Sequence, residues 1–277
     1  MVMPLDMFSE IVTTPFMQRA ILVGMCIGVV GPLIGSFLVH REMALIGEAL
    51  AHTAFAGVAI GIVAGTQMDW GGSPLFVALA VVILAALGLQ YLSTHTDAYG
   101  DVPLAILLTG GFALGIAVIT WGVAFTAQIG QYLYGSILAV SWTSVYLMFA
   151  LSVVVISIVL VTHKQLLMIT FDREVARASG IRVAAYDTIL IVMTAIVVVG
   201  AMQMLGAILV AAMLVVPVAA AMSLTASFYR SIWLSIGVGE LMVLLGIFLS
   251  YVFDIATGAM IVLVGIGLYL VALAIGR

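Results

Sequence analysis

The chain contains apolar stretches that are too long and too poor in charge for the interior of a water-soluble domain. The longest runs from Thr188 to Tyr229 and holds no charged residue over 42 positions. A helix of that length would extend about 63 Å, enough for two crossings of a roughly 30 Å hydrocarbon core. Because 65% of the 277 residues are hydrophobic and 7% are charged, a soluble fold would lack a polar surface. The sequence therefore predicts an all-α, polytopic helical membrane protein.

The apolar runs predict eight or nine transmembrane helices in a single transmembrane domain, residues 1–277. Each run approaches the roughly 20 residues that a spanning helix needs. Within the uncharged stretch, Gly200, Gln203 and Gly206 mark the expected turn between two crossings. The segment 126–141 is expected to be an external connection. The other expected spans are Ala20–Val39, Ala44–Gly65, Pro74–Leu92, Pro103–Phe125, Trp142–Val161, Ser231–Tyr251 and Gly258–Gly276.

The basic residues predict the orientation, because cytoplasmic loops are enriched in Lys and Arg. With nine spans, Arg19 falls on one side of the membrane and seven basic residues fall on the other. We therefore expect a multi-pass protein of the cell membrane, with its N-terminus outside and its C-terminus in the cytoplasm. The seven residues are Arg41, Lys164, Arg173, Arg177, Arg182, Arg230 and Arg277.

The segment Phe171–Ile181, in the longest polar interval, predicts a short cytoplasmic helix. Acidic residues at its start and a basic residue later suit the helix dipole, and a glycine near its end is typical of a helix stop. These residues are Asp172, Glu174, Arg177 and Gly180. Its apolar residues Phe171, Val175, Ala178 and Ile181 are expected to share a stripe. Such a helix either lies on the membrane surface or contacts another protein, and the residues alone leave both open.

Glu48 and His52 lie four residues apart inside an otherwise apolar span. A helix places positions i and i+4 on one face. Burying the charge in lipid costs roughly 2.5–3.5 kcal/mol, so such residues usually face a bundle interior or a water-filled path. A carboxylate and an imidazole are together suitable ligands for a divalent transition metal. The structural alternative is a buried, hydrogen-bonded pair that fastens two helices.

Two further acidic residues are weaker candidates for a metal path. Glu240 lies in the middle of an expected span, where it either lines the path or bonds to a neighbouring helix. Asp254 lies at the expected outer interface. It either guides cations inward or caps the last helix, and the cap is favoured.

Several chemistries are excluded by what the sequence lacks. The single cysteine, Cys26, rules out an internal disulfide and a multi-thiolate metal site. The single lysine, Lys164, does not lie in a G-x-x-x-x-G-K-[ST] loop, so P-loop binding of ATP is excluded. We expect no catalytic residues, no permanently bound cofactor and no nucleic-acid partner.

Five segments, in order along the chain, resemble the permease subunit of the zinc/manganese-type metal ion ATP-binding-cassette importers. Together they are specific, although each alone would be weak. Arg41–Ala59 resembles RRMALLGDALSHAVLPGVA, Tyr132–Ser141 resembles YLFGDILAVS, Phe171–Ile181 resembles FDPEFARALGL, Gly206–Ala221 resembles GxLLVxALLIIPAATA, and Ser250–Gly258 resembles SYYLDLPSG.

The resemblance implies that Glu48 and His52 form part of the path of transported Zn²⁺ or Mn²⁺. It also implies that Phe171–Gly180 is a coupling helix seated in a groove of a separate cytoplasmic ATPase subunit, which would hydrolyse ATP. The other implied partners are an extracytoplasmic metal-binding protein and a second copy of the permease, besides membrane lipid. The family usually has Asp where this chain has Glu48, and the added methylene moves the carboxylate outward.

Two other transport functions remain open from the residues. A proton-coupled secondary metal carrier would use Glu48 and Glu240 as a relay, but such carriers often show internal repeats, and none is evident. A related permease for an iron chelate or cobalamin is disfavoured by the short chain and by the acidic-plus-His pair. Because Glu and His bind zinc, manganese and ferrous iron alike, the sequence does not select among them.

Overall fold

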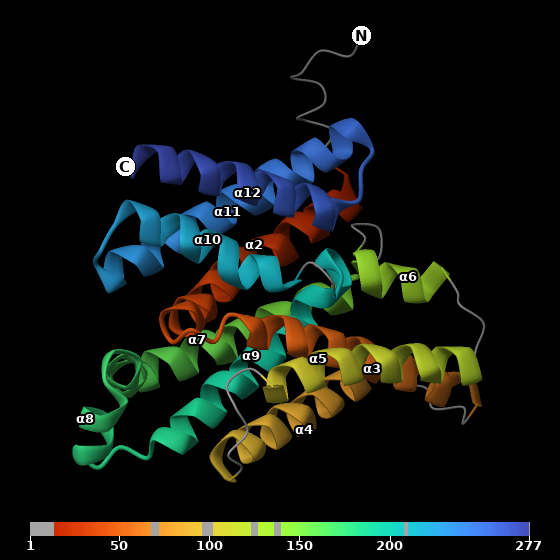
Figure 1. Ribbon diagram of the computed structural model, residues 1–277. Coiled ribbons are helices and arrows are strands. Elements are labelled where there is room, and N and C mark those ends of the chain that lie inside the picture. Colours follow the sequence, from red (N-terminus) through yellow and green to blue (C-terminus); the bar gives the residue numbers. More distant parts are fainter. Residues whose placement is uncertain are drawn as a thin grey trace.

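The protein is a bundle of long helices in the computed structural model, which describes residues 14–67, 72–95, 102–122, 127–135, 140–207 and 210–276 (Figure 1). The helices are α2 (Pro15–His40), α3 (Leu45–Gln67), α4 (Pro74–His95), α5 (Val102–Gly122), α6 (Ala127–Tyr134), α7 (Trp142–Phe171), α8 (Arg173–Ala178), α9 (Val183–Leu205), α10 (Val210–Leu224), α11 (Phe228–Phe253) and α12 (Thr257–Ile275).

Eight of the described helices are long and apolar enough to cross a membrane, which confirms the expected fold class. They are α2, α3, α4, α5, α7, α9, α11 and α12. A further apolar helix, α10, has 15 residues. Its length of about 22 Å is less than the roughly 30 Å hydrocarbon core. The sequence-based choice between eight and nine spans therefore rests on α10.

The long helices alternate in direction between two ends of the bundle. At one end, here called the α8 end, the last residues of α2 and α7 meet the first residues of α9 and α11. At the other, here called the α6 end, the end of α3 meets the end of α5, and α6 contacts the residues just after α9. These ends lie at the left and right of Figure 1.

Most basic residues lie at the α8 end, as the order of the expected spans predicts. Arg19 lies near the start of α2, at the α6 end. The basic residues in or beside helix termini at the α8 end are Arg41, Lys164, Arg173, Arg177, Arg182 and Arg230. Arg277 lies outside the described residues.

The turn between α9 and α10 lies at Gly206, one of the three positions expected for it. Its φ of +83° is in the left-handed region that favours glycine. The next residue, Ala207, donates its N–H to the carbonyl oxygen of Tyr132 at 2.8 Å. That bond joins the turn to α6, a helix the sequence analysis did not anticipate in the segment 126–141. Gly200, another expected turn position, lies inside α9.

Glycines bring α3 into close contact with both α4 and α5. A Cβ at Gly57 would lie 2.5 Å from Cα of Ala78, and one at Gly61 would lie 2.8 Å from Cα of Pro74. A Cβ at Gly111 would lie 2.9 Å from the backbone of Thr53. In lipid, helices associate through van der Waals packing instead of the hydrophobic effect, and small residues let their backbones come close enough for this packing. These glycines therefore serve close packing of α3 against its two neighbours.

A buried ionic network joins four helices at the α8 end. The carboxylate of Asp187, 4% exposed, accepts a hydrogen bond from Arg41 at 2.9 Å and another from Arg173. Arg41 also donates to Oγ1 of Thr170 and to the carbonyl oxygen of Leu166, both at 2.8 Å. Burial lowers the pKa of Arg41 to about 10, against the opposing effect of Asp187, so the side chain stays a cation at neutral pH.

Replacing Asp187 with Asn is expected to destabilise the protein by about 3–5 kcal/mol, because Arg41 would remain buried without its counter-charge. The free energy of unfolding would be measured by SDS titration of the detergent-solubilised protein. The matched control is Glu174→Gln, which removes an exposed ion pair with Arg177 and is expected to cost less than about 1 kcal/mol. Equal losses in the two variants would contradict the structural role of Asp187.

Adjacent glycines on α5 provide a second test, of close packing. Gly111→Ala is expected to destabilise by about 1–3 kcal/mol, because the added methyl group meets the backbone of Thr53. At Gly110 a Cβ meets nothing within 4 Å, so Gly110→Ala is expected to gain up to about 1 kcal/mol of helix propensity. The same unfolding assay applies. If Gly111→Ala were as stable as Gly110→Ala, the contact between α3 and α5 would be looser than described.

Candidate functional site

Glu48 and His52 lie in the first half of α3, toward the α8 end of the bundle. Glu48 is in the first turn of the helix, and His52 lies about 11 Å along the axis from Leu45. A carboxylate in the first turn is favoured by the helix dipole. Both side chains are half-buried, and their spacing of four residues places them on one face of the helix.

The imidazole of His52 is held by packing rather than by hydrogen bonds. Its ring meets that of Phe112 on α5 edge to face, with centroids 5.1 Å apart and planes at 90°. Its Nδ1 atom is buried and has no hydrogen-bond partner among the described residues. Buried polar atoms are usually paired. The alternative interpretation, a hydrogen-bonded pair that fastens two helices, is therefore not supported.

The two side chains carry groups that can bind a metal, a carboxylate and an imidazole. Within the described parts of the chain, no group of three or more His, Cys, Asp or Glu side chains could hold a metal ion together. A tight structural site usually has four ligands. The pair could therefore offer two ligands, which is half of such a set.

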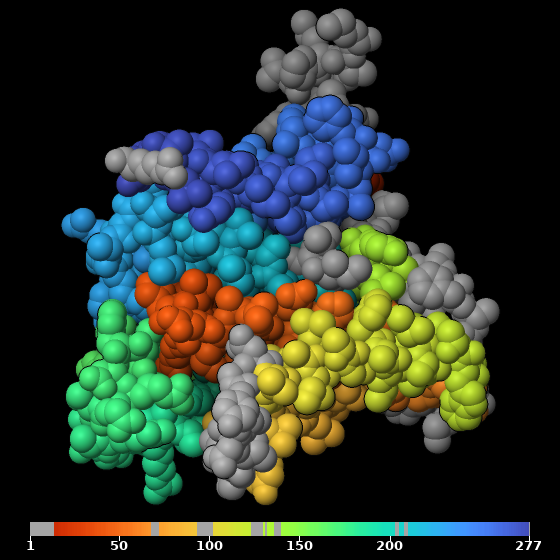
Figure 2. All heavy atoms as spheres, in the orientation of Figure 1, coloured from red at the N-terminus to blue at the C-terminus, as the bar shows by residue number. Residues whose placement is uncertain are grey.

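The helix that packs beside His52 lies at the surface of the molecule. α5 contacts α3 through Gly111 and Gly115, and its other faces are largely exposed, including Ile106 and Leu114. Figure 2 shows its side chains, in yellow, at the surface of the molecule. The site is therefore separated from the outside of the bundle by a single helix.

Glu240 does not join this pair. It lies on α11 against α2, where a Cβ at Gly28 would come within 2.8 Å of its Oε1 atom. That oxygen is buried and has no hydrogen-bond partner among the described residues. Since the described contacts of Glu240 are with α2, the structure gives no support to a relay between Glu240 and Glu48.

Asp254 is not a cap of the last helix, as the sequence analysis favoured. It is exposed and ends α11, with a left-handed φ of +54°. The residue before α12 is Ala256, which has no side-chain cap. The expectation was wrong because the N-cap position of α12 is Ala256, so Asp254 lies two residues too early to cap that helix.

The expected coupling segment forms a shorter helix than predicted. Phe171 is the last residue of α7, and Asp172 interrupts the helix with an extended backbone, φ −152° and ψ 106°. The carboxylate of Asp172 accepts hydrogen bonds from the backbone N–H groups of Glu174 and Val175, at 2.9 Å each. α8 therefore begins at Arg173, and its stop is at the expected Gly180, where φ is +81°.

The inner face of α8 is formed by Ala176. This residue is fully buried, with Ile169 and Val183 around it. Val175 and Ala178, which the sequence analysis expected to share a stripe, are both exposed. The side chain of Phe171 is also exposed, although its ring lies 5.7 Å from that of Phe228. α8 thus presents a mixed apolar and charged surface, with Glu174 and Arg177 paired at 2.9 Å.

Asp187 is the residue of this region that the sequence analysis missed. Its network links the end of α2 to the segment that carries α8. A signal was present, because Asp187 is an acidic residue immediately before the long uncharged stretch.

Comparisons with known proteins cover nearly the whole chain. The model of the family described as "ABC 3 transport family" matches residues 13–276. The manganese transport system membrane protein MntC of Listeria innocua is 32% identical over 257 residues, which cover 93% of this chain and 89% of that protein. A "probable iron transport system membrane protein" of Haemophilus influenzae is 29% identical over 272 residues, 98% of each chain.

A solved structure agrees with these sequence relationships. The structure of "PsaBC from Streptococcus pneumoniae in complex with Fab" matches with a TM-score of 0.85 and 31% identity, over 98% of this chain and 95% of that one. The resemblance drawn from the five sequence segments is confirmed. The chain belongs to the ABC 3 transport family, as a multi-pass membrane permease.

Proposed function

We propose that this protein is the membrane-spanning permease of an ATP-driven importer of divalent metal ions, and that its cargo is Mn²⁺. Manganese is favoured over zinc because the names of several relatives specify manganese transport. One relative is named for iron, and carboxylate and imidazole ligands suit all three metals. The proposal rests on membership of the family and on one observation, the unpaired imidazole of His52 one turn from Glu48.

In this proposal Glu48 and His52 bind the metal transiently on its way through the bundle. The Nδ1 atom of His52 has no hydrogen-bond partner among the described residues, and Glu48 is in none of their salt bridges, so both side chains are available as ligands. Two protein ligands with water completing the sphere suit a carrier that must release its cargo. The added methylene of Glu48, relative to the usual Asp, extends the carboxylate further from the α3 backbone.

A second copy of the chain would complete the pathway. We infer a homodimer with the metal path along the contact between subunits. Two copies would supply two Glu48–His52 pairs, and the exposed faces of α5 would be available for the contact. Each copy would act as one transmembrane domain.

The orientation follows from the basic residues. The α8 end carries most of them, and we infer that it is cytoplasmic, with the N-terminus outside. An ATPase subunit, which would carry out ATP hydrolysis, would then dock against α8. An extracytoplasmic metal-binding protein would deliver the ion at the α6 end. The Asp187 network would transmit movement of α8 to α2 and α9 because it bonds all of them directly.

Removing both proposed ligands is expected to abolish most transport. Loss of residues that merely orient metal ligands costs 10–100-fold in affinity, so Glu48→Ala with His52→Ala should lower Mn²⁺ uptake by more than about tenfold. Uptake would be measured in vesicles containing the permease and its ATPase, with Zn²⁺ and Fe²⁺ as competitors. Glu240→Gln, the carboxylate control, is expected to retain uptake.

Two outcomes of this experiment would contradict the proposal. Wild-type uptake by the double variant at normal membrane abundance would remove Glu48 and His52 from the path. Uptake that continued without ATP and stopped when a protonophore collapsed the proton gradient would indicate the secondary carrier instead. Loss of uptake in Glu240→Gln as well would favour the same carrier, since the relay needs both carboxylates.

A charge on the exposed face of α8 is expected to disrupt the ATPase contact. Val175 is 50% exposed, so Val175→Asp should leave the fold intact. In the complex, the new carboxylate would be buried without a partner in the contact between α8 and the ATPase. Co-purification of the ATPase is therefore expected to fall at least about tenfold. Ile255→Asp is the matched control, since Ile255 is 44% exposed at the opposite end. If the two variants retained the ATPase equally, α8 would not be the docking site.

A further inference from the structure

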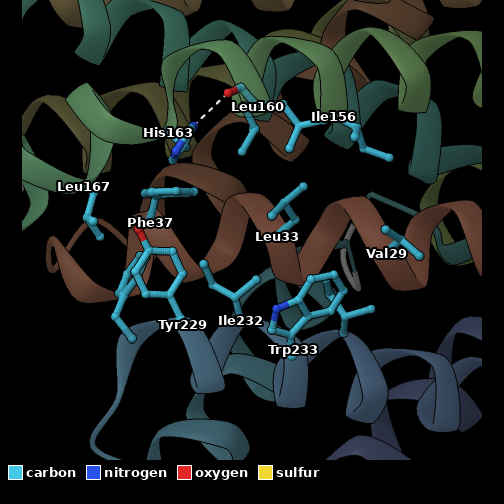
Figure 3. A pocket seen from close by; sticks show the side chains of 13 residues that line it. Val29, Leu33, Phe37, Ile156, Leu160, His163, Leu167, Tyr229, Ile232 and Trp233 are labelled. Carbon is cyan, nitrogen blue, oxygen red and sulfur yellow. Dashed lines mark hydrogen bonds between the residues drawn. The ribbon is translucent and has the colours of Figure 1, made fainter.

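An apolar groove runs along the outside of the bundle between α2, α7 and α11, with a volume of about 290 Å³ (Figure 3). Val29, Leu33 and Phe37 form its floor, because residues four apart on α2 share one face. Leu160 of α7 and Trp233 of α11 flank it and are 66% and 74% exposed. Because these two side chains are exposed, the groove opens at the surface of the bundle.

The groove ends in polar side chains toward the α8 end, and each is next to a basic residue in the chain. His163 and Tyr229 line it there, and His163 donates a hydrogen bond from Nδ1 to the carbonyl oxygen of Leu160 at 2.7 Å. Each is followed in the chain by an exposed cation, Lys164 or Arg230. Neither cation pairs with a described acidic residue. Arg230 lies in the first turn of α11, where the helix dipole disfavours a positive charge.

Most acidic side chains of this end are already engaged. Asp187 is held by two arginines, and Glu174 is paired with Arg177. Asp172 accepts hydrogen bonds from the start of α8. Glu42 lies in a neighbouring hollow that is also lined by Arg41 and Arg173. The positive charge beside the groove is therefore left for a ligand from outside the chain.

We propose that this groove binds an anionic phospholipid, with an acyl chain against Leu33 and Trp233 and the headgroup phosphate beside Lys164 and Arg230. Apolar walls suit the chain, and Tyr and Trp side chains favour the level of the headgroups. Basic residues near a membrane surface attract anionic lipids, each by about fivefold in association constant. A zwitterionic phospholipid would fill the same groove but would gain less from the two cations.

Trp233 provides a local probe of the groove. The full chain would keep Trp233 as its one tryptophan, with Phe in place of Trp70, Trp121 and Trp142. This variant would be reconstituted into membranes that contain phospholipids brominated on the acyl chain. Brominated phosphatidylglycerol is expected to quench Trp233 with at least about fivefold greater relative affinity than brominated phosphatidylcholine. The matched control retains Trp121 alone, which is 85% exposed at the other end of the bundle on α5, and is expected to show no preference.

Charge variants connect the preference to the two cations. In the double variant Lys164→Gln, Arg230→Gln, the ratio of the two lipid affinities measured at Trp233 is expected to fall close to one. Arg230→Lys keeps the charge and should retain the preference for phosphatidylglycerol. Folding of each variant would be checked by circular dichroism. Equal quenching by both lipids in the wild-type background would overturn the proposal. So would a Trp233 that neither lipid quenches while Trp121 is quenched, because a protein surface would then cover the groove. A preference that survives loss of both cations would also overturn it.

Discussion

The carboxylate of Asp187 bonds Arg41 and Arg173 and so joins the ends of α2 and α9 to the start of α8. A buried charge of this kind is tolerated because its partners and further hydrogen bonds compensate for lost hydration. Arg41 extends the network to the last turns of α7 through Thr170 and Leu166. Four chain segments that are distant in sequence therefore meet at one carboxylate, and the position of α8 relative to the spans depends on it.

Close helix contact has a different origin in the part of the bundle around α3. Glycines let α4 and α5 approach its backbone, and such contacts leave little room for polar partners. His52 consequently packs against the ring of Phe112 instead of a hydrogen-bonding group. Among the described residues, the Nδ1 atom of His52 therefore has a ring beside it and no hydrogen-bond partner. The proposed role of His52 in binding and releasing a cation depends on this arrangement.

Much of the architecture was predictable from hydropathy, including the long spans and the turn at Gly206. The errors occurred at helix ends. Asp172 interrupts a continuous apolar pattern through its own backbone conformation, so α8 begins later than expected and turns Ala176 inward. Helix α6 was missed because its eight residues are too short for a clear periodic signal. Asp254 was misassigned because it ends α11, whereas the N-cap position of α12 falls two residues later.

The sequence by itself determined the class of fold, the asymmetry of basic charge and the pairing of Glu48 with His52. Each of these depends on residues close together in the chain, through helix geometry or through transfer of a segment into lipid. Only the tertiary structure decided that Phe112 covers His52, that Glu240 lies apart on α11, and that Asp187 holds two arginines. Lipid discriminates weakly among apolar helix faces, so the partner of each face is settled by the fit of side chains from distant segments.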